Sequence, residues 1–241
     1  MFYPPRCPFC SSLLSSFKNM AGGETAGLAW AAPVELEGLL CRDCLAIVPW
    51  LEDERCPRCG HTPAIEAGHC SFCSRVPFAF DLCCILGHYR EGMRDAVHRY
   101  KYSGQKGLAP ALGELLYLRL KALPWAASLE AVVPVPLARE RLAQRGYNQS
   151  FLLAEVLADK LQLPLLNVLE KNRQTASQTG LSRVQRKRNV EDVFHCIHAP
   201  PPGSKLLLVD DVLTSGATSH AAARLLKEAG ASWVGLAVLA R

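Results

Sequence analysis

The chain has 241 residues, 49% hydrophobic and 20% charged, values typical of a globular protein with one large or two modest domains. Its 27 Lys and Arg against 22 Asp and Glu give a formal charge of +5, which argues against a disordered acidic tail and against a strongly basic chromatin-type protein. No apolar run approaches the roughly 18 residues of a membrane span, and the N-terminal residues lack the apolar core of a secretory signal. We therefore expect a cytoplasmic protein without membrane insertion.

Eleven cysteines are the most informative feature of the composition, and eight of them form four Cys-x-x-Cys pairs. A Cys-x-x-Cys turn places two thiolates where they can occupy two corners of a tetrahedron around zinc. Four such turns predict two structural zinc sites of four cysteines each, with no open position for chemistry. The predicted ligands are Cys7, Cys10, Cys41, Cys44, Cys56, Cys59, Cys70 and Cys73.

More than one arrangement of these ligands is open. Joining the first pair with the second and the third with the fourth gives two consecutive zinc ribbons, which we favour over a cross-braced arrangement of the first with the third. A vestigial pair, a redox pair, or substitution by His61 or His69 are weaker alternatives, and no thioredoxin-type strand–helix context surrounds the cysteines. We assign residues 1–75 to a double zinc-ribbon module that metal binding stabilises. Cys83, Cys84 and Cys196 lack partners at ligand spacing, and the first two lie in an apolar run expected to be buried.

The remaining residues, 76–241, alternate between apolar runs and amphipathic segments. Continuous apolar strands separated by helices indicate a parallel sheet covered on both faces. We therefore predict an α/β fold with a doubly wound parallel sheet. In chain order the predicted elements are helices over Met93–Lys101 and Leu108–Leu123, a strand over Leu129–Val135, a helix over Gln149–Leu163, a strand over Lys205–Val209, a helix over Ser215–Glu228 and a strand over Ser232–Ala240.

Two adjacent carboxylates follow the strongest of these strands. In a parallel sheet, Asp210 and Asp211 would reach the ligand crevice at the carboxyl end, where they suit ribose hydroxyls, directly or through Mg²⁺. Small and hydroxylated residues follow and open a helix, whose N-terminal amides favour a phosphate. This expected phosphate cradle comprises Thr214, Ser215, Gly216, Ala217 and Thr218. A receiver-type acidic pocket or a well-capped helix is the plainer alternative.

The segment from Lys205 to Thr218 resembles the 5-phosphoribosyl-1-pyrophosphate (PRPP) motif of type I phosphoribosyltransferases: an apolar strand, two acids, then Thr-Ser-Gly-x-Thr. The resemblance implies that the fold is of type I phosphoribosyltransferase type and that the domain binds PRPP with Mg²⁺. It also implies that Asp210 and Asp211 meet the ribose hydroxyls and that Thr214 to Thr218 hold the 5-phosphate. Catalysis in this superfamily depends on positioning rather than on a covalent residue, so we assign no catalytic residue.

Two further segments narrow the family: VPVPL with the following RGYNQ, and the run KNRQTASQTGLSRVQRKRNVEDVF. Together with the Cys-x-x-Cys pairs and the stretch from Tyr89 to Tyr102, they make the whole chain similar to the ComF/GntX family. That resemblance implies a role in DNA uptake during natural transformation, or in the use of DNA as a nutrient. It makes single-stranded DNA and DNA-uptake helicase or channel proteins the expected partners.

Basic residues in the same segments are candidates for anion binding. Arg141 and Arg145 follow a strand end and can grip pyrophosphate oxygens, although they could merely precede a capped helix on a solvated face. Residues 171–188 carry six basic residues and no acid, which favours a mobile loop beside an anion site, a strip for a nucleic-acid backbone, or a solvated face. We take Lys171 and Arg173 as pyrophosphate candidates, and the nucleic-acid candidates are Arg183, Arg186, Lys187 and Arg188.

Three functions are compatible with this sequence. The favoured one is a ComF-type factor that handles internalised single-stranded DNA in the cytosol. The second is a catalytic phosphoribosyltransferase acting on a base or small amine, a glycosyltransferase of the pentosyl class. The third is a PRPP-sensing regulator without chemistry.

Overall fold

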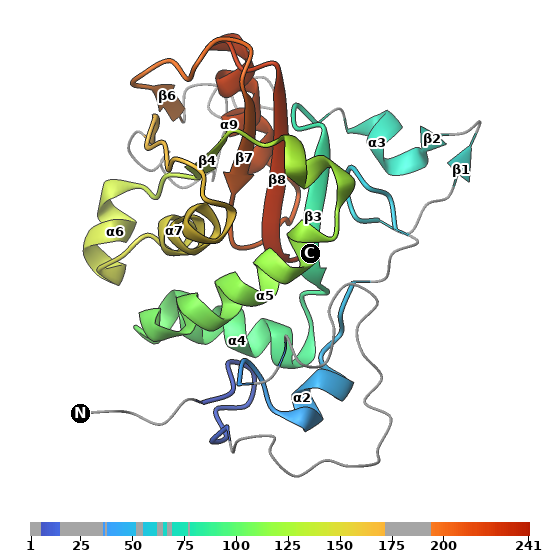
Figure 1. Ribbon diagram of the computed structural model, residues 1–241, viewed down its shortest axis with the longest axis vertical. Helices are drawn as coiled ribbons and strands as arrows, with labels where there is room; N and C mark the ends of the chain where they lie inside the picture. Colours follow the sequence, from blue (N-terminus) through green and yellow to red (C-terminus); the bar gives the residue numbers. More distant parts are fainter. Residues whose placement is uncertain are drawn as a thin grey trace, which may run out of the picture.

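A four-stranded parallel sheet forms the centre of the protein (Figure 1). The computed structural model describes residues 6–14, 36, 38–51, 55–61, 65–66, 69–76, 78–171 and 194–241. In spatial order the strands are β3 (Leu82–Gly87), β8 (Trp233–Ala240), β7 (Lys205–Val209) and β4 (Ala131–Pro134), each parallel to its neighbours. The predicted parallel α/β sheet is confirmed.

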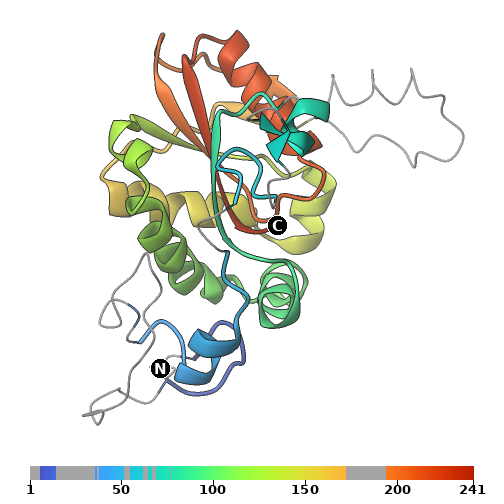
Figure 2. The ribbon, with the colours of Figure 1, turned by 90° about the vertical axis from the view of Figure 1, so that its right-hand side faces the viewer.

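Helices cover both faces of this sheet (Figure 2). One face packs against α4 (Glu91–Tyr102), α5 (Ala109–Lys121) and α7 (Gln149–Leu161). The other packs against α9 (Ala217–Glu228) and a short antiparallel hairpin of β5 (Leu169–Lys171) and β6 (Phe194–Cys196). Burial on both faces explains why the central strands read as continuous apolar runs.

The strand β3 was not among the predicted strands, although its apolar run was expected to be buried. Alternate side chains point to opposite faces of a strand, so Cys84 joins the core beneath α4 and α5 while Cys83 joins the core beneath α9. Both thiols are buried, and desolvation raises the pKa of Cys84 to about 12. The two adjacent cysteines are therefore core residues on opposite sides of the sheet.

The remaining elements are short, and several bounds differ from those predicted. The segment after β4, for which no element was predicted, contains the helix α6 (Arg139–Arg145), which ends at Gly146 with φ +80°. Helix α9 begins at Ala217 because Gly216, with φ +78°, lies outside the helical region. The others are α2 (Arg42–Ile47), β1 (Ile65–Glu66), β2 (His69–Cys70), α3 (Ser71–Arg75), η1 (Lys106–Leu108) and η2 (Pro124–Ser128).

The two cysteine-containing regions lie at different places on the domain (Figure 1). The region with α2 lies beside α4, where the Arg99 guanidinium donates to the carbonyls of Pro8 at 2.6 Å and Phe9 at 2.8 Å. The region with α3 lies beside β3, where Arg58 donates to the carbonyls of Phe78 and Phe80. The first region thus contributes to the hydrophobic core that contains α4 and α5, and the second to the core that contains α9.

Within the described ranges, no helix is both long and apolar enough to cross a membrane.

Candidate functional site

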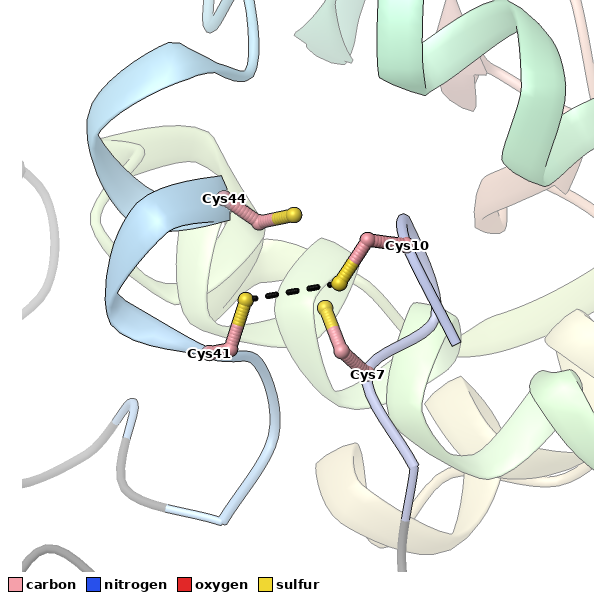
Figure 3. A group of neighbouring side chains, drawn as sticks. All are labelled: Cys7, Cys10, Cys41 and Cys44. Carbon is pink, nitrogen blue, oxygen red and sulfur yellow. Dashed lines mark hydrogen bonds between the residues drawn. The ribbon is translucent and has the colours of Figure 1, made fainter. Parts of the chain in front are cut away.

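The eight paired cysteines form two clusters, each made of two consecutive Cys-x-x-Cys pairs. Cys7, Cys10, Cys41 and Cys44 face one another between the N-terminal turn and α2 (Figure 3). The second cluster comprises Cys56, Cys59, Cys70 and Cys73, and Cys70 lies in β2, which pairs with β1. In each cluster the four sulfur atoms lie within 4.8 Å of one another. The structure therefore has the sequential arrangement and not the cross-braced one.

The distances between the sulfur atoms fit a tetrahedral metal ion. Sγ–Sγ distances are 3.5 Å for Cys10–Cys41, 3.8 Å for Cys56–Cys73 and 3.7 Å for Cys59–Cys70. A tetrahedron with Zn–S bonds of about 2.3 Å has edges of about 3.8 Å. Both clusters are thus suited to hold one structural zinc ion each, with thiolates at all four positions.

Aromatic and cationic side chains surround the second cluster. The His61 ring stacks on Phe72 with centroids 3.8 Å apart, and the Arg241 guanidinium lies 5.2 Å from the centre of the Phe72 ring. His61 is not a member of the four-sulfur group, so the cysteine set is complete without it. A metal bound by four thiolates carries net negative charge, which the nearby Arg241 side chain would offset.

A pocket of about 300 Å³ opens at the carboxyl end of the sheet. It collects residues from the ends of β4, β7 and α4 and from the beginnings of α7 and α9. Among the predicted site residues, its lining includes Asp210, Asp211, Thr214, Thr218, Arg141, Arg145 and Lys171. Ligands bind at this edge of parallel α/β sheets, because loops and helix N-termini converge there.

The two carboxylates of this pocket are buried and differ in their partners. Asp210 Oδ1 accepts hydrogen bonds from Ser150 Oγ and from the Asp211 amide, both at 2.9 Å. Burial, and then the adjacent charge of Asp211, raises the pKa of Asp210 to about 7. Asp211 Oδ1 lies 2.7 Å from the Lys101 ammonium, whereas its buried Oδ2 has no hydrogen-bond partner among the described residues. Because such an oxygen is costly to bury unpaired, the pair fits a ligand that brings hydroxyl donors or a divalent cation such as Mg²⁺.

The loop after Asp211 has the form of a cradle at the beginning of α9. Leu213 donates its amide to the Ala240 carbonyl at 2.9 Å, which holds the loop against the end of β8. A Cβ on Gly216 would come within 2.3 Å of the Phe78 ring, and the positive φ there also favours glycine. Thr214, Ser215, Ala217 and Thr218 are exposed around it, and the Ala217 amide donates to Ser215 Oγ at 3.4 Å. Exposed hydroxyls at the beginning of a helix suit a phosphate.

Lys101 and Ser150 line the pocket although neither was predicted as a site residue, and the packing of α4 against α7 places them there. Tyr100, at the core of α4, donates its hydroxyl to the Gln149 carbonyl at 2.8 Å, and Tyr147 donates to the Tyr100 carbonyl. These contacts join α4 to the start of α7 and bring Lys101 and Ser150 to the two aspartates. The only sequence signal for Lys101 was its place in the Tyr89–Tyr102 stretch of the family resemblance, which assigned it no role, and Ser150 had none.

Three of the predicted basic residues line the pocket, and the other five lie outside the described residues. Arg141 and Arg145 reach the pocket from α6, and Lys171 reaches it from β5 with its ammonium 5.1 Å from the centre of the Phe194 ring. Burial, and then the charge of Arg141, lowers the pKa of Lys171. Five candidates lie outside the described residues: Arg173, Arg183, Arg186, Lys187 and Arg188.

Comparisons with known proteins agree on one family. The family model of the phosphoribosyl transferase domain matches residues 148–241. Competence protein F of Haemophilus influenzae is 33% identical over 192 residues, which cover 77% of this chain and 84% of that protein. DNA utilization protein YhgH of Escherichia coli K12 is 30% identical over 89% of this chain and 97% of its own length. Competence protein ComFC of Streptococcus pneumoniae is 30% identical over 81% of this chain and 84% of its own.

Solved structures resemble the chain more distantly. Adenine phosphoribosyltransferase from Saccharomyces cerevisiae matches over 55% of this chain and 68% of its own length, with a TM-score of 0.36 and 18% identity.

Proposed function

This chain belongs to the ComF family, and from that premise we propose that it is a DNA-uptake or DNA-utilisation factor whose phosphoribosyltransferase-type domain binds PRPP. In this role it handles internalised single-stranded DNA in the cytosol. The names of its relatives support the link to DNA, and the phosphoribosyl transferase match supports the link to PRPP. Residues 1–75 act as the zinc-ribbon module and residues 76–241 as the PRPP-binding domain.

The observation that supports PRPP binding is that acidic, hydroxyl-bearing and cationic side chains line the same pocket. Asp210 and Asp211 follow the end of β7, Thr214 lies in the loop after them, and Thr218 lies in the first turn of α9. PRPP needs these two environments, because its ribose carries hydroxyl donors and its 5-phosphate carries negative charge. Arg141, Arg145 and Lys171, lining the same pocket, supply charge for the pyrophosphate.

Calorimetric titration with PRPP·Mg²⁺ tests this assignment. The double substitution Asp210→Asn with Asp211→Asn is expected to abolish binding and leave the thermal unfolding cooperative. Asp95→Asn is the matched control, since this carboxylate lies on α4 with its side chain 62% exposed. Unchanged PRPP affinity in the double variant would contradict the assigned site.

Binding of labelled single- and double-stranded oligonucleotides across a salt series, with and without PRPP·Mg²⁺, tests the DNA part. We expect a preference for single strands and an affinity that falls steeply with salt, because phosphate contacts release counterions. Absence of DNA binding at low salt would contradict this part and leave PRPP binding in place.

Transferase chemistry is the second candidate, and a second cavity next to the pocket favours it. This cavity, of about 520 Å³, shares Lys101, Tyr102, Arg141 and Arg145 with the pocket and has room for an acceptor. Release of pyrophosphate from PRPP in the presence of bases or small amines would support catalysis. Binding of PRPP that changes DNA affinity without pyrophosphate release would instead support a sensing role.

A further inference from the structure

The second cavity lies between the end of α4 and helix α6. We propose that it binds one nucleotide unit of a DNA single strand, with Tyr102 stacking against the base and Arg141, Arg145 and Lys101 holding the backbone phosphate. This inference rests on the proposed function and assigns the place where the strand meets the protein.

The charge of the cavity suits a phosphate. The described residues that line it are Lys101, Tyr102, Gly104, Arg141, Gln144 and Arg145, and these six include three cations and no carboxylate. Clustered cations concentrate positive potential in a concave space. Guanidinium groups also match phosphate oxygens through two parallel hydrogen bonds.

Tyr102 gives the cavity an aromatic surface. As the last residue of α4 it is 66% exposed, so its ring contributes little to the core. The Arg145 guanidinium lies 5.0 Å from its ring centre, and the His98 ring lies at 5.0 Å. Bases of single-stranded DNA stack on exposed aromatic rings, and a neighbouring arginine adds to this interaction. Such binding does not depend on the DNA sequence, because every base has a flat face that can stack.

Lys101 connects this cavity with the PRPP pocket. Its ammonium pairs with Asp211 at 2.7 Å, yet the residue also lines the second cavity. Arg141 and Arg145 also line both spaces, and they are the residues assigned to the pyrophosphate of PRPP. The two ligands therefore compete for these cations, and each should lower the other's affinity by the same factor, as thermodynamic linkage requires.

The test measures affinity for three probes: oligo(dT), an abasic oligonucleotide of equal length, and the mononucleotide dTMP. Tyr102→Ala is expected to weaken oligo(dT) binding about tenfold and to leave abasic binding unchanged, whereas Tyr102→Phe keeps wild-type affinity. Arg141→Gln is expected to weaken the binding of both oligonucleotides. It should also reduce the slope of log affinity against log salt concentration by about 0.7. Arg139→Gln is the matched control, because this arginine lies on the same helix, is 88% exposed and lines neither cavity. With PRPP present, oligo(dT) should bind more weakly to the wild type, and Arg141→Gln should lessen this effect of PRPP.

The outcomes separate this inference from the function on which it rests. If the wild type binds oligo(dT) and neither Tyr102→Ala nor Arg141→Gln weakens it, the strand binds elsewhere, and the proposed function stands without this site. If dTMP binds as tightly as oligo(dT), the cavity is a mononucleotide site and the strand assignment is wrong. If no oligonucleotide binds while PRPP does, both the inference and the DNA role fail.

Discussion

The Lys101 ammonium lies 2.7 Å from Asp211 Oδ1 and joins the end of α4 to the end of β7. The Lys101 side chain is 16% exposed and that of Asp211 is 6% exposed. For comparison, the two side chains of the Lys227–Asp81 ion pair are 32% and 30% exposed. A buried carboxylate beside a second one at Asp210 requires such a cation, since two like charges at this spacing repel.

Removal of the cation should therefore destabilise the fold. We expect Lys101→Met to lower the free energy of unfolding by about 3 kcal/mol at pH 8, because it leaves a buried charge uncompensated. Urea denaturation measures this loss, and adding Asp211→Asn should recover part of it in a double-mutant cycle. Lys106→Met, at an exposed lysine in η1, should change stability by less than about 0.5 kcal/mol. Equal losses in the two single variants would show that the ion pair does not stabilise the protein.

The raised pKa of Asp210 predicts a pH-dependent stability. Burial, and then the charge of Asp211, moves the pKa of this carboxyl from 3.8 to about 7, so the folded state holds a proton that the unfolded state has lost. Its contribution to the free energy of unfolding is therefore largest below about pH 4 and declines as the pH rises to about 7. Asp210→Asn should flatten that decline and raise the melting temperature at pH 8. The exposed Asp95→Asn variant should keep the wild-type slope of unfolding free energy against pH. An identical slope in all three proteins would contradict the raised pKa of Asp210.

Gly216 and Gly203 form a matched pair for testing the cradle. Both have positive φ, +78° and +75°, but a Cβ meets the Phe78 ring at 2.3 Å only at Gly216 and has nothing within 4 Å at Gly203. Alanine at either position should cost about 1 kcal/mol for the left-handed backbone, and Gly216→Ala about 1–3 kcal/mol more from the collision. Melting temperature and PRPP affinity measure the two effects, and we expect a loss of PRPP binding for Gly216→Ala alone. If Gly203→Ala lowers the melting temperature and the PRPP affinity as much as Gly216→Ala does, the collision with Phe78 is not the cause of these losses.

Metal analysis of paired cysteine variants tests the ligand sets. With the sequential arrangement, Cys7→Ser with Cys41→Ser disrupts one cluster and should leave about one zinc per chain. Cys7→Ser with Cys56→Ser disrupts both clusters and should leave about none. Cross-bracing of the first pair with the third predicts the reverse result, so the comparison of the two double variants decides between the arrangements.

Local patterns in the sequence were sufficient for the types of element and for the positions of the acids. The strand Lys205–Val209 has the predicted bounds, because an apolar run buried on both faces is visible without knowing its neighbours. Asp210 and Asp211 follow directly, and the carboxyl end of a parallel strand fixes the edge on which they lie. The cysteine spacing likewise identified the eight residues whose sulfur atoms gather in the two four-cysteine clusters.

Contacts between distant segments were decided by tertiary structure alone. The sequence left two arrangements of the cysteine pairs open, and the folded chain brings Cys41 to Cys10. Lys101 and Ser150 reach the aspartates from α4 and α7 because those helices pack on the sheet through Tyr100 and its neighbours. Periodicity reports how one segment is buried, whereas the identity of the segment opposite depends on the free energy of packing the whole chain, which local spacing does not contain.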